Sequence, residues 1–358
     1  MKKNTRIIAL LLCFVMIFSL CGCSIGPINL FGGSMTTPVQ REVFAMDTIM
    51  TLTAYGKDSD DGLDAAENII NAMDSLLDPE LETSAAYLIN NANGENVIVQ
   101  PQVADMLNTA LEVYNRSSGA LDLSVYPIYL AWGEFKEETA RVPSNEELAE
   151  LRQHLNFGDM SITAFTGEAN YSVSLPAGTQ ISFGSVAKGC AAEYAINAMR
   201  EAGVKSGLVS LGGNVQTLGL KPNGDNWTIA VEDPKSTGNY VGTLSVGETA
   251  IVTSGNYQRY FRGDNGQIYH HIIDPSTGMP VENNLLSVTI ICEDGTLADC
   301  LSTAMYVLGE KDALKYWRTY GGFDMIMITD DGRVICTSGL IEIFTLTNDT
   351  NYAVTFAE

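Results

Sequence analysis

The sequence has 358 residues, of which 46% are hydrophobic and 18% are charged, and its formal net charge is −23 at pH 7. Such an acidic balance excludes nucleic acid and anionic membrane surfaces as partners, because both bind clustered Lys and Arg. The chain is long enough for one large domain or two, and no internal repeat or low-complexity linker divides it.

The first residues have the features of an export signal. Three basic residues lie among the first six, and an apolar run from Ile7 to Leu20 follows, which is short for a stable transmembrane helix. The run ends in Leu-Cys-Gly-Cys, which is similar to a bacterial lipobox. Residues 1–22 are therefore predicted to be a lipoprotein signal peptide, with Cys23 as the lipidated residue. The alternative is an ordinary signal peptide whose cysteines are incidental.

Cleavage after residue 22 would remove three basic residues and no acidic ones, which changes the net charge from −23 to −26. Residues 23–40 contain Gly, Ser, Pro and Thr with little periodic pattern, and predict a flexible tether. We expect residues 41–358 to form an exported domain, held by its lipid on the outer face of the cell membrane.

Amphipathic helices and β-branched runs alternate along the rest of the chain. Helices are predicted at 63–77, 103–114, from Ser144 with a capping-box Glu147, at 187–202, and at 297–308. Strands are predicted at 43–55, 207–211, 227–232, 250–253, 286–292, 325–329 and 334–345. Asn-Gly and Asp-Gly pairs between the runs favour antiparallel hairpins. The sequence thus predicts an α+β fold with mixed, largely antiparallel sheets and flanking helices.

The cysteines beyond Cys23 give no sign of a metal centre. Cys190, Cys292, Cys300 and Cys336 form no CxxC pair and no cluster with histidine, which argues against zinc. One disulfide is possible in an exported protein of this size but is not required. Three of the four have apolar neighbours, so we expect buried free thiols.

The segment Gly184–Gly189 precedes and opens the alanine-rich helix. Small residues there let the backbone approach a phosphate, and a helix N-terminus favours anions. The spacing is not that of a Walker A loop, so the segment alone is weak support for a phosphate site.

Two of the three histidines, His270 and His271, lie just ahead of an Asp-Pro-Ser-Thr-Gly turn, separated from it by two isoleucines. Their position favours a functional role, and the alternative is a partly buried histidine bonded to a backbone carbonyl. Further along, Asp299 and Thr303 are four residues apart on a predicted helix, so that both oxygens share one face. Such a pair offers hard ligands for Mg²⁺, although helix-surface polarity is the simpler explanation when the pair is considered alone.

Together with four further stretches, these motifs resemble the FAD:protein FMN transferase (ApbE-like) family. Phe44–Thr48 is similar to the family's Met-Gly-Thr strand, and Ser117–Asp122, continuing to Pro127 and Trp132-Gly133, is similar to its Gly-Ala-Phe-Asp stretch. Leu211–Asn214 is similar to its Leu-Gly-Gly-Asp turn, and Thr253–Tyr257 to its Ser-Gly-Asp-Tyr. The seven motifs keep the family's order from about residue 43 to 303, and the signal and tether lie outside the match.

The resemblance implies a role for each matching residue. The FAD site would be lined by Met46, Ala120, Leu121, Asp122, Ser182, Lys188 and Ile272. Asp299 and Thr303 would hold Mg²⁺, with a further oxygen from Ser185, and His271 would be the catalytic base rather than His270. Members of such a family split FAD as substrate, attach FMN through its phosphate to a threonine hydroxyl of an acceptor flavoprotein, and release AMP. The acceptor would be a protein such as a membrane electron-transport subunit or a secreted flavoprotein.

This chain departs from the family pattern at some positions. Ser182 replaces an aspartate, Asp47 a glycine and Cys190 a tyrosine, and Glu80 lies where an aromatic residue is common. These changes bear on FAD affinity more than on metal binding. Alternative functions are an FAD-binding or FAD-storing lipoprotein without transfer, an FAD pyrophosphatase that uses water in place of threonine, and a solute-binding lipoprotein of other specificity.

Overall fold

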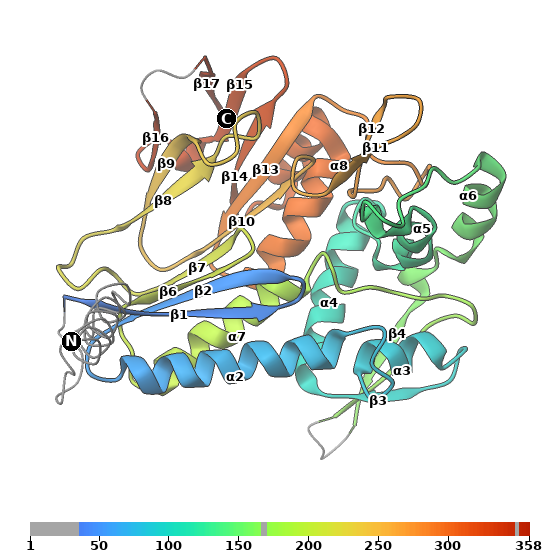
Figure 1. Ribbon diagram of the computed structural model, residues 1–358, viewed down its shortest axis with the longest axis horizontal. Coiled ribbons are helices and arrows are strands. Elements are labelled where there is room, and N and C mark those ends of the chain that lie inside the picture. Colours follow the sequence, from blue (N-terminus) through green and yellow to red (C-terminus); the bar gives the residue numbers. More distant parts are fainter. Residues whose placement is uncertain (1–35, 166–169, 348–350) are drawn as a thin grey trace, which may run out of the picture. The chain divides into compact units, whose positions relative to one another are not determined.

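The computed structural model describes residues 36–165, 170–347 and 351–358, and the predicted signal peptide with Cys23 lies outside these ranges. Within them, nine strands form one sheet in the order β1-β2-β6-β7-β10-β13-β14-β15-β17 (Figure 1). The strands of this sheet are β1 (Pro38–Ala45), β2 (Thr48–Tyr55), β6 (Gly207–Leu211), β7 (Asn214–Leu218), β10 (Ala250–Gly255), β13 (Leu285–Cys292), β14 (Asp324–Thr329), β15 (Arg333–Thr337) and β17 (Ala353–Ala357). Neighbouring strands pair antiparallel, except that β15 and β17 pair parallel. The prediction of a mixed, largely antiparallel α+β fold is confirmed.

Four long helices share the main hydrophobic core with the sheet, and three of them pack directly on one of its faces (Figure 1). They are α2 (Ser59–Leu77), α4 (Pro101–Arg116), α7 (Ala187–Glu201) and α8 (Gly295–Tyr320). Local sequence explains their starts, since Pro101 occupies the first turn of α4 and the Asp294 carboxylate caps α8 by accepting the N–H of Leu297 at 2.8 Å. Helices α2, α7 and α8 bury apolar side chains against the sheet, whereas α4 buries its apolar stripe mainly against α8.

A second, smaller sheet packs on the opposite face. It has the order β16-β9-β8, with β8 (Trp227–Glu232), β9 (Tyr240–Val246) and β16 (Phe344–Leu346). Its buried side chains, among them Trp227 and Leu244, form a separate core with Ile251, Ile326 and Val334 of the large sheet. The large sheet is therefore buried on both faces over much of its width, which explains its continuous apolar runs.

The remaining elements surround one end of the helical layer. They are the short helices α3 (Ala85–Asn91), α5 (Tyr126–Ala131) and α6 (Asn145–Leu151), the strands β3 (Val97–Val99), β4 (Ser161–Ala164), β5 (Tyr171–Ser174), β11 (Tyr260–Arg262) and β12 (Ile268–His270), and four 3₁₀ turns. A fifth 3₁₀ turn, η5 (Ser338–Leu340), follows β15 and contacts the large sheet. The predicted cap of α6 is present, because Ser144 Oγ accepts the N–H of Glu147 at 3.1 Å. A small aromatic core joins α5 to β12, and in it the indole N–H of Trp132 donates to the carbonyl of Gly278 at 2.9 Å.

Three predicted elements differ in extent from the structure. The run 43–55 is two strands joined by a tight turn, and β1 begins at Pro38, inside the segment predicted to be a tether. The run 334–345 is also broken, since β15 ends at Thr337 and β16 belongs to the other sheet. Helix α8 continues past a non-helical Gly309 (φ 73°) to Tyr320. Polar residues or glycine lie at these breaks, at Asp47, Ser338-Gly339 and Gly309, but the apolar residues that resume directly after them made each run look continuous.

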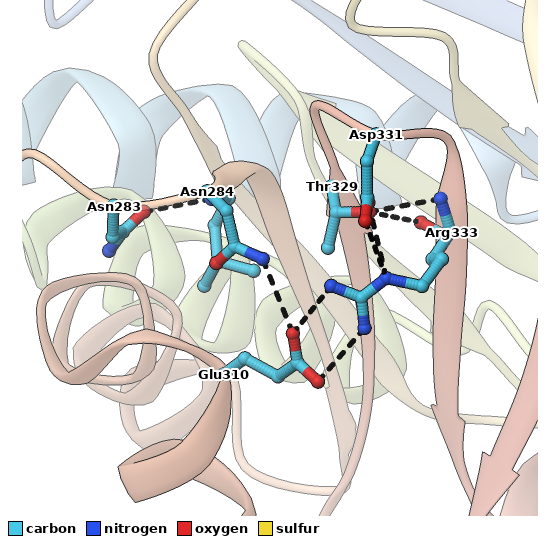
Figure 2. Close-up of polar contacts among 7 residues, drawn as sticks. Asn283, Asn284, Glu310, Thr329, Asp331 and Arg333 are labelled. Carbon is cyan, nitrogen blue, oxygen red and sulfur yellow. Dashed lines mark hydrogen bonds and ion pairs between the residues drawn. The ribbon is translucent and has the colours of Figure 1, made fainter.

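An ion-pair cluster fastens the second part of α8 to the sheet (Figure 2). The guanidinium of Arg333 donates to both carboxylate oxygens of Glu310, at 3.0 and 2.9 Å, and also to Asp331. Asn284 donates to the same Glu310 carboxylate at 3.3 Å. The Arg333 guanidinium holds the pKa of Glu310 below its usual value. The cluster anchors α8 directly after the irregular Gly309.

The four described cysteines, at 190, 292, 300 and 336, are all free and buried, as expected from their apolar neighbours. Burial raises the pKa of Cys190, Cys292 and Cys336 to about 12, so these thiols stay protonated and unreactive at neutral pH. No helix in residues 36–165, 170–347 and 351–358 is long and apolar enough to cross a membrane.

Candidate active site

One cleft of about 1050 Å³ collects residues from distant parts of the chain. Its wall is built from the β1–β2 turn, the segments around η1 (Leu123–Val125), the start of α7, the end of β10, the segment after β12 and the first turns of α8. All eleven residues proposed from the sequence for FAD, metal and catalysis line it: Met46, Ala120, Leu121, Asp122, Ser182, Ser185, Lys188, His271, Ile272, Asp299 and Thr303. The fold thus brings together the whole predicted set.

The β1–β2 turn enters the cleft in a strained conformation. Met46 and Asp47 have positive φ of 50° and 58°, the geometry of a two-residue hairpin turn that usually contains Asn-Gly. The backbone N–H of Met46 donates to Asp74 Oδ1 on α2 at 2.9 Å, which ties the turn to the helical layer. The side chains at positions 46 and 47 are therefore held at the cleft by the hairpin and by α2.

The loop before α7 places small residues and a helix start in the cleft. Ser182 Oγ accepts the N–H of Gly184 at 3.2 Å, so the hydroxyl that replaces the family's carboxylate closes the loop on itself. Ser185, two residues before α7, and Lys188, in its first turn, follow, and both are half-buried. This arrangement offers a positive helix end and a cationic side chain to an anion in the cleft.

Asp122 serves a local structural role as well as lining the cleft. Its Oδ1 accepts the N–H of Ser124 at 2.8 Å and the hydroxyl of the same residue at 2.5 Å, which caps the η1 turn. Burial raises the pKa of this carboxyl above its usual value, while the two bonds from Ser124 oppose the rise.

Asp299 and Thr303 lie one turn apart on α8 and face the cleft together, as their spacing predicts. Asp299 is almost fully buried, and its Oδ2 accepts the N–H of Gly189 from α7 at 2.8 Å. A Cβ at Gly189 would lie 2.1 Å from the carbonyl oxygen of Gly295 and 2.6 Å from Asp299 Cβ, so only glycine permits this contact between the helices. The carboxylate and the hydroxyl are hard oxygen donors and fit Mg²⁺.

The two adjacent histidines have different environments. His270 is buried: its Nε2 bonds the carbonyl of Val281 at 3.0 Å, and its Nδ1 accepts the N–H of Ile272 at 3.3 Å. His271 lines the cleft, and its Nδ1 bonds the carbonyl of Arg259 at 3.1 Å. A carbonyl can only accept, so Nδ1 of His271 carries the hydrogen and Nε2 keeps a free lone pair.

Burial lowers the pKa of both imidazoles below the usual value, and for His271 the nearby charges of Arg259 and Lys188 lower it further. His271 is therefore neutral at pH 7 and can accept a proton at Nε2. His270 therefore fits the alternative to a functional role, which is a histidine bonded to a backbone carbonyl.

Comparisons with known proteins agree with this arrangement. The sequence model described as the ApbE family matches residues 46–327. The chain belongs to the ApbE family. It is 29% identical over 345 residues to an FAD:protein FMN transferase of Treponema pallidum, and the match covers 92% of this chain and 93% of the relative. It is 31% identical to an FAD:protein FMN transferase of Vibrio cholerae, and that match covers 68% of this chain and 72% of the relative. Among solved structures, the ApbE protein of Thermotoga maritima superposes with a TM-score of 0.77 at 28% identity, over 85% of this chain and 98% of that one.

Several residues of this ApbE-family protein line the cleft without having been predicted. Two of them are cations, Lys136 and Arg259, and three are tyrosines, Tyr126, Tyr129 and Tyr257. Arg259 lies two residues after the Ser-Gly-Asn-Tyr stretch, and Lys136 three residues after Trp132-Gly133, so both neighbour recognised motifs. Proximity to a motif is the one sequence signal that could have indicated them.

The side chains that line the cleft carry an excess of negative charge. Eight carboxylates line it, against three cationic side chains, Lys136, Lys188 and Arg259. The carboxylates are Asp47, Asp74, Asp78, Glu80, Asp122, Glu134, Glu232 and Asp299. Lys136 is already paired with Glu134 at 2.6 Å. A pyrophosphate entering this cleft needs a further positive charge beside it.

Proposed function

We propose that this ApbE-family protein is a Mg²⁺-dependent flavin transferase that splits FAD and joins FMN, through its phosphate, to a threonine hydroxyl of an acceptor flavoprotein. The observation that carries the proposal is the assembly of all eleven predicted residues in one cleft, from chain segments as far apart as Met46 and Thr303. Relatives that cover most of the chain are named FAD:protein FMN transferase, which agrees with this activity.

The proposed transfer forms one bond to phosphorus and breaks another. The acceptor's threonine oxygen attacks the phosphorus of the FMN half, the bond from that phosphorus to the bridging oxygen breaks, and AMP leaves with the electron pair. A hydroxyl is a weak nucleophile, so its proton must be taken up as the bond forms. Nε2 of His271 is neutral, bears a lone pair and lines the cleft, and it is proposed to accept that proton.

The leaving phosphate needs positive charge. Asp299 and Thr303 would hold Mg²⁺ with an oxygen from Ser185, and the bound ion would supply neutralisation of the pyrophosphate. The acidic wall agrees with this requirement, because three cations cannot offset eight carboxylates and a pyrophosphate. Lys188 and the first turn of α7 would orient the same phosphates.

The proposal is tested with the purified protein, FAD, Mg²⁺ and a candidate acceptor flavoprotein. Release of AMP together with flavin fluorescence on the acceptor band of a denaturing gel is the expected result. AMP without labelled acceptor would identify an FAD pyrophosphatase. Tight FAD binding without AMP would identify a storage protein, and either outcome would contradict the transferase proposal.

The location of the protein is proposed on the sequence motif alone. Lipidation of Cys23 would hold the enzyme on the outer face of the membrane, beside acceptors such as electron-transport subunits. We expect Cys23→Ser to move the protein from the membrane fraction to the soluble fraction. If the variant still sediments with membranes after a salt wash, the lipid anchor is wrong.

A further inference from the structure

Three hydroxyl groups form a chain that ends at one of the proposed metal ligands. Ser302 Oγ donates to the backbone carbonyl of Asp299 at 2.9 Å, one turn back on α8. Ser254 Oγ, at the end of β10, lies 2.8 Å from Ser302 Oγ and 3.3 Å from Thr303 Oγ1. Ser302 is fully buried, whereas Ser254 and Thr303 are half-buried and line the cleft, so the chain runs from the core to the cleft wall.

The directions of these bonds follow from counting hydrogens. A carbonyl oxygen can only accept, so the single hydrogen of Ser302 is used on Asp299. The 2.8 Å contact therefore has Ser254 as its donor, which uses the hydrogen of Ser254. In the longer 3.3 Å contact, the hydrogen comes from Thr303. The hydroxyl chain thus directs the hydrogen of Thr303 Oγ1 toward Ser254 on β10. The lone pairs of that oxygen therefore point away from Ser254.

We infer that Ser254 and Ser302 are positioning residues, which orient the Thr303 hydroxyl so that its oxygen accepts a cation. A neutral hydroxyl binds Mg²⁺ through a lone pair, and a hydrogen pointing at the ion would oppose binding. The inference rests on the proposed function, because it concerns the Mg²⁺ ligands assigned there. It adds two residues that are proposed to act through Thr303 rather than as metal ligands themselves.

A purely structural role for these three hydroxyl groups is the competing explanation, since the same bonds also join α8 to β10. The two explanations differ in what the variants change. If the bonds only join the elements, Ser302→Ala lowers stability and leaves metal affinity unaltered. If they orient Thr303, metal affinity falls even in protein that is fully folded.

A second pair of hydroxyl groups in the protein provides a matched control. Thr253 and Thr289 form another hydroxyl pair between β10 and its neighbour β13, at 2.9 Å, and Thr289 is buried and does not line the cleft. Thr289→Val, on β13, removes a hydroxyl bond to β10 that is not connected by a hydrogen bond to Thr303. It therefore reports the cost of losing such a bond by itself.

The experiment is calorimetric titration of the full chain with Mg²⁺ alone, without FAD, in folded samples checked by thermal melting. We expect Ser302→Ala and Ser254→Ala each to weaken Mg²⁺ binding about fivefold, the worth of one hydrogen bond. Thr289→Val should stay within about twofold of wild type. The double variant Ser254→Ala/Ser302→Ala should be little worse than either single one, and Ser302→Ala should add nothing in a Thr303→Val background.

The inference is overturned if Ser302→Ala binds Mg²⁺ as the wild type does, or if its effect persists without the Thr303 hydroxyl. Should Ser302→Ala fail to fold, Ser254→Ala at its half-buried position carries the same test. Loss of affinity in Asp299→Asn but not in the serine variants would leave the metal site intact and reject this inference alone. Absence of Mg²⁺ binding in the wild type would reject the metal site and the inference together.

Discussion

At the scale of single residues, His271 is the group on which the proposed chemistry depends most directly. Its Nδ1 hydrogen is used on the Arg259 carbonyl, which leaves the lone pair on Nε2, and the residue lines the cleft. We expect His271→Ala to leave FAD affinity within a few-fold and to lower the transfer rate by about 10²–10⁴, the usual contribution of a positioned base. FAD titration by fluorescence and single-turnover transfer measure the two quantities. A parallel loss of both would make His271 a cofactor contact.

The pH dependence of transfer follows from the lowered pKa of His271. Because the neutral imidazole is the active form, a lowered pKa keeps it active as the pH falls. The kcat/KM for transfer should therefore stay level from pH 8 through 6.5 and decline only at more acidic pH. His270→Ala is the control, and its primary effect should be on stability, because His270 is buried and bonded to Val281.

The Asp299 carboxylate is the charged ligand of the proposed metal site. Asp299→Asn replaces it by a neutral ligand, so Mg²⁺ affinity should fall by about tenfold or more, and AMP release should recover partly at high Mg²⁺. Asp294→Asn is a matched control on the same helix, because Asn caps α8 as well as Asp does. Full AMP release by Asp299→Asn at low Mg²⁺ would remove this residue from the site.

At the scale of elements, the contact between α7 and α8 sets the position of the metal ligands. The helices meet where Gly189 donates to Asp299 and approaches Gly295. The first turn of α7 and the Asp299–Thr303 face of α8 are therefore brought to the same part of the cleft wall. The contact depends on the missing side chain at position 189.

Gly189→Ala tests this contact. Its Cβ would overlap backbone at 2.1 Å, which a flexible side chain cannot relieve, so we expect a loss of about 1–3 kcal/mol in unfolding free energy and weaker Mg²⁺ binding. Gly184→Ala, in the loop just before, would meet Ser182 Oγ at 3.5 Å, an ordinary contact, and should change stability by only about 0.5 kcal/mol. Denaturant titration measures both. Equal stability of the two variants would contradict the close approach.

At the scale of the whole molecule, the acidic charge extends into the cleft that is proposed to bind an anion. The chain has a net charge of −23, and the cleft has eight carboxylates against three cations. Repulsion of FAD by these charges must be offset by a metal or reduced by screening.

FAD binding measured with a chelator present should therefore strengthen as salt rises from low ionic strength to about 0.15 M, where the Debye length is about 8 Å. With Mg²⁺ added, the same titration should depend much less on salt. Fluorescence quenching of the flavin measures both series. Affinity that falls steadily with salt in the absence of metal would indicate a cationic site and contradict this reading of the cleft.

The sequence by itself determined the element types and eleven of the residues that meet in the cleft. Local pattern and composition predicted α2, α4, α7 and the first part of α8, and the motifs indicated the eleven cleft residues, because both signals are local and depend on residue type and spacing. The capping pattern of Ser144 with Glu147 and the i, i+4 pair of Asp299 with Thr303 are of this kind.

Only the tertiary structure decided which residues meet. That His270 is buried and His271 lies in the cleft depends on Val281 and Arg259, and neither contact appears in the local sequence. The same holds for the Gly189–Asp299 contact between helices 110 residues apart, and for the Ser254–Ser302–Thr303 chain between β10 and α8. Such pairings follow from the packing of α7 and α8 on the sheet, and packing is a property of the whole fold that no short stretch of residues encodes.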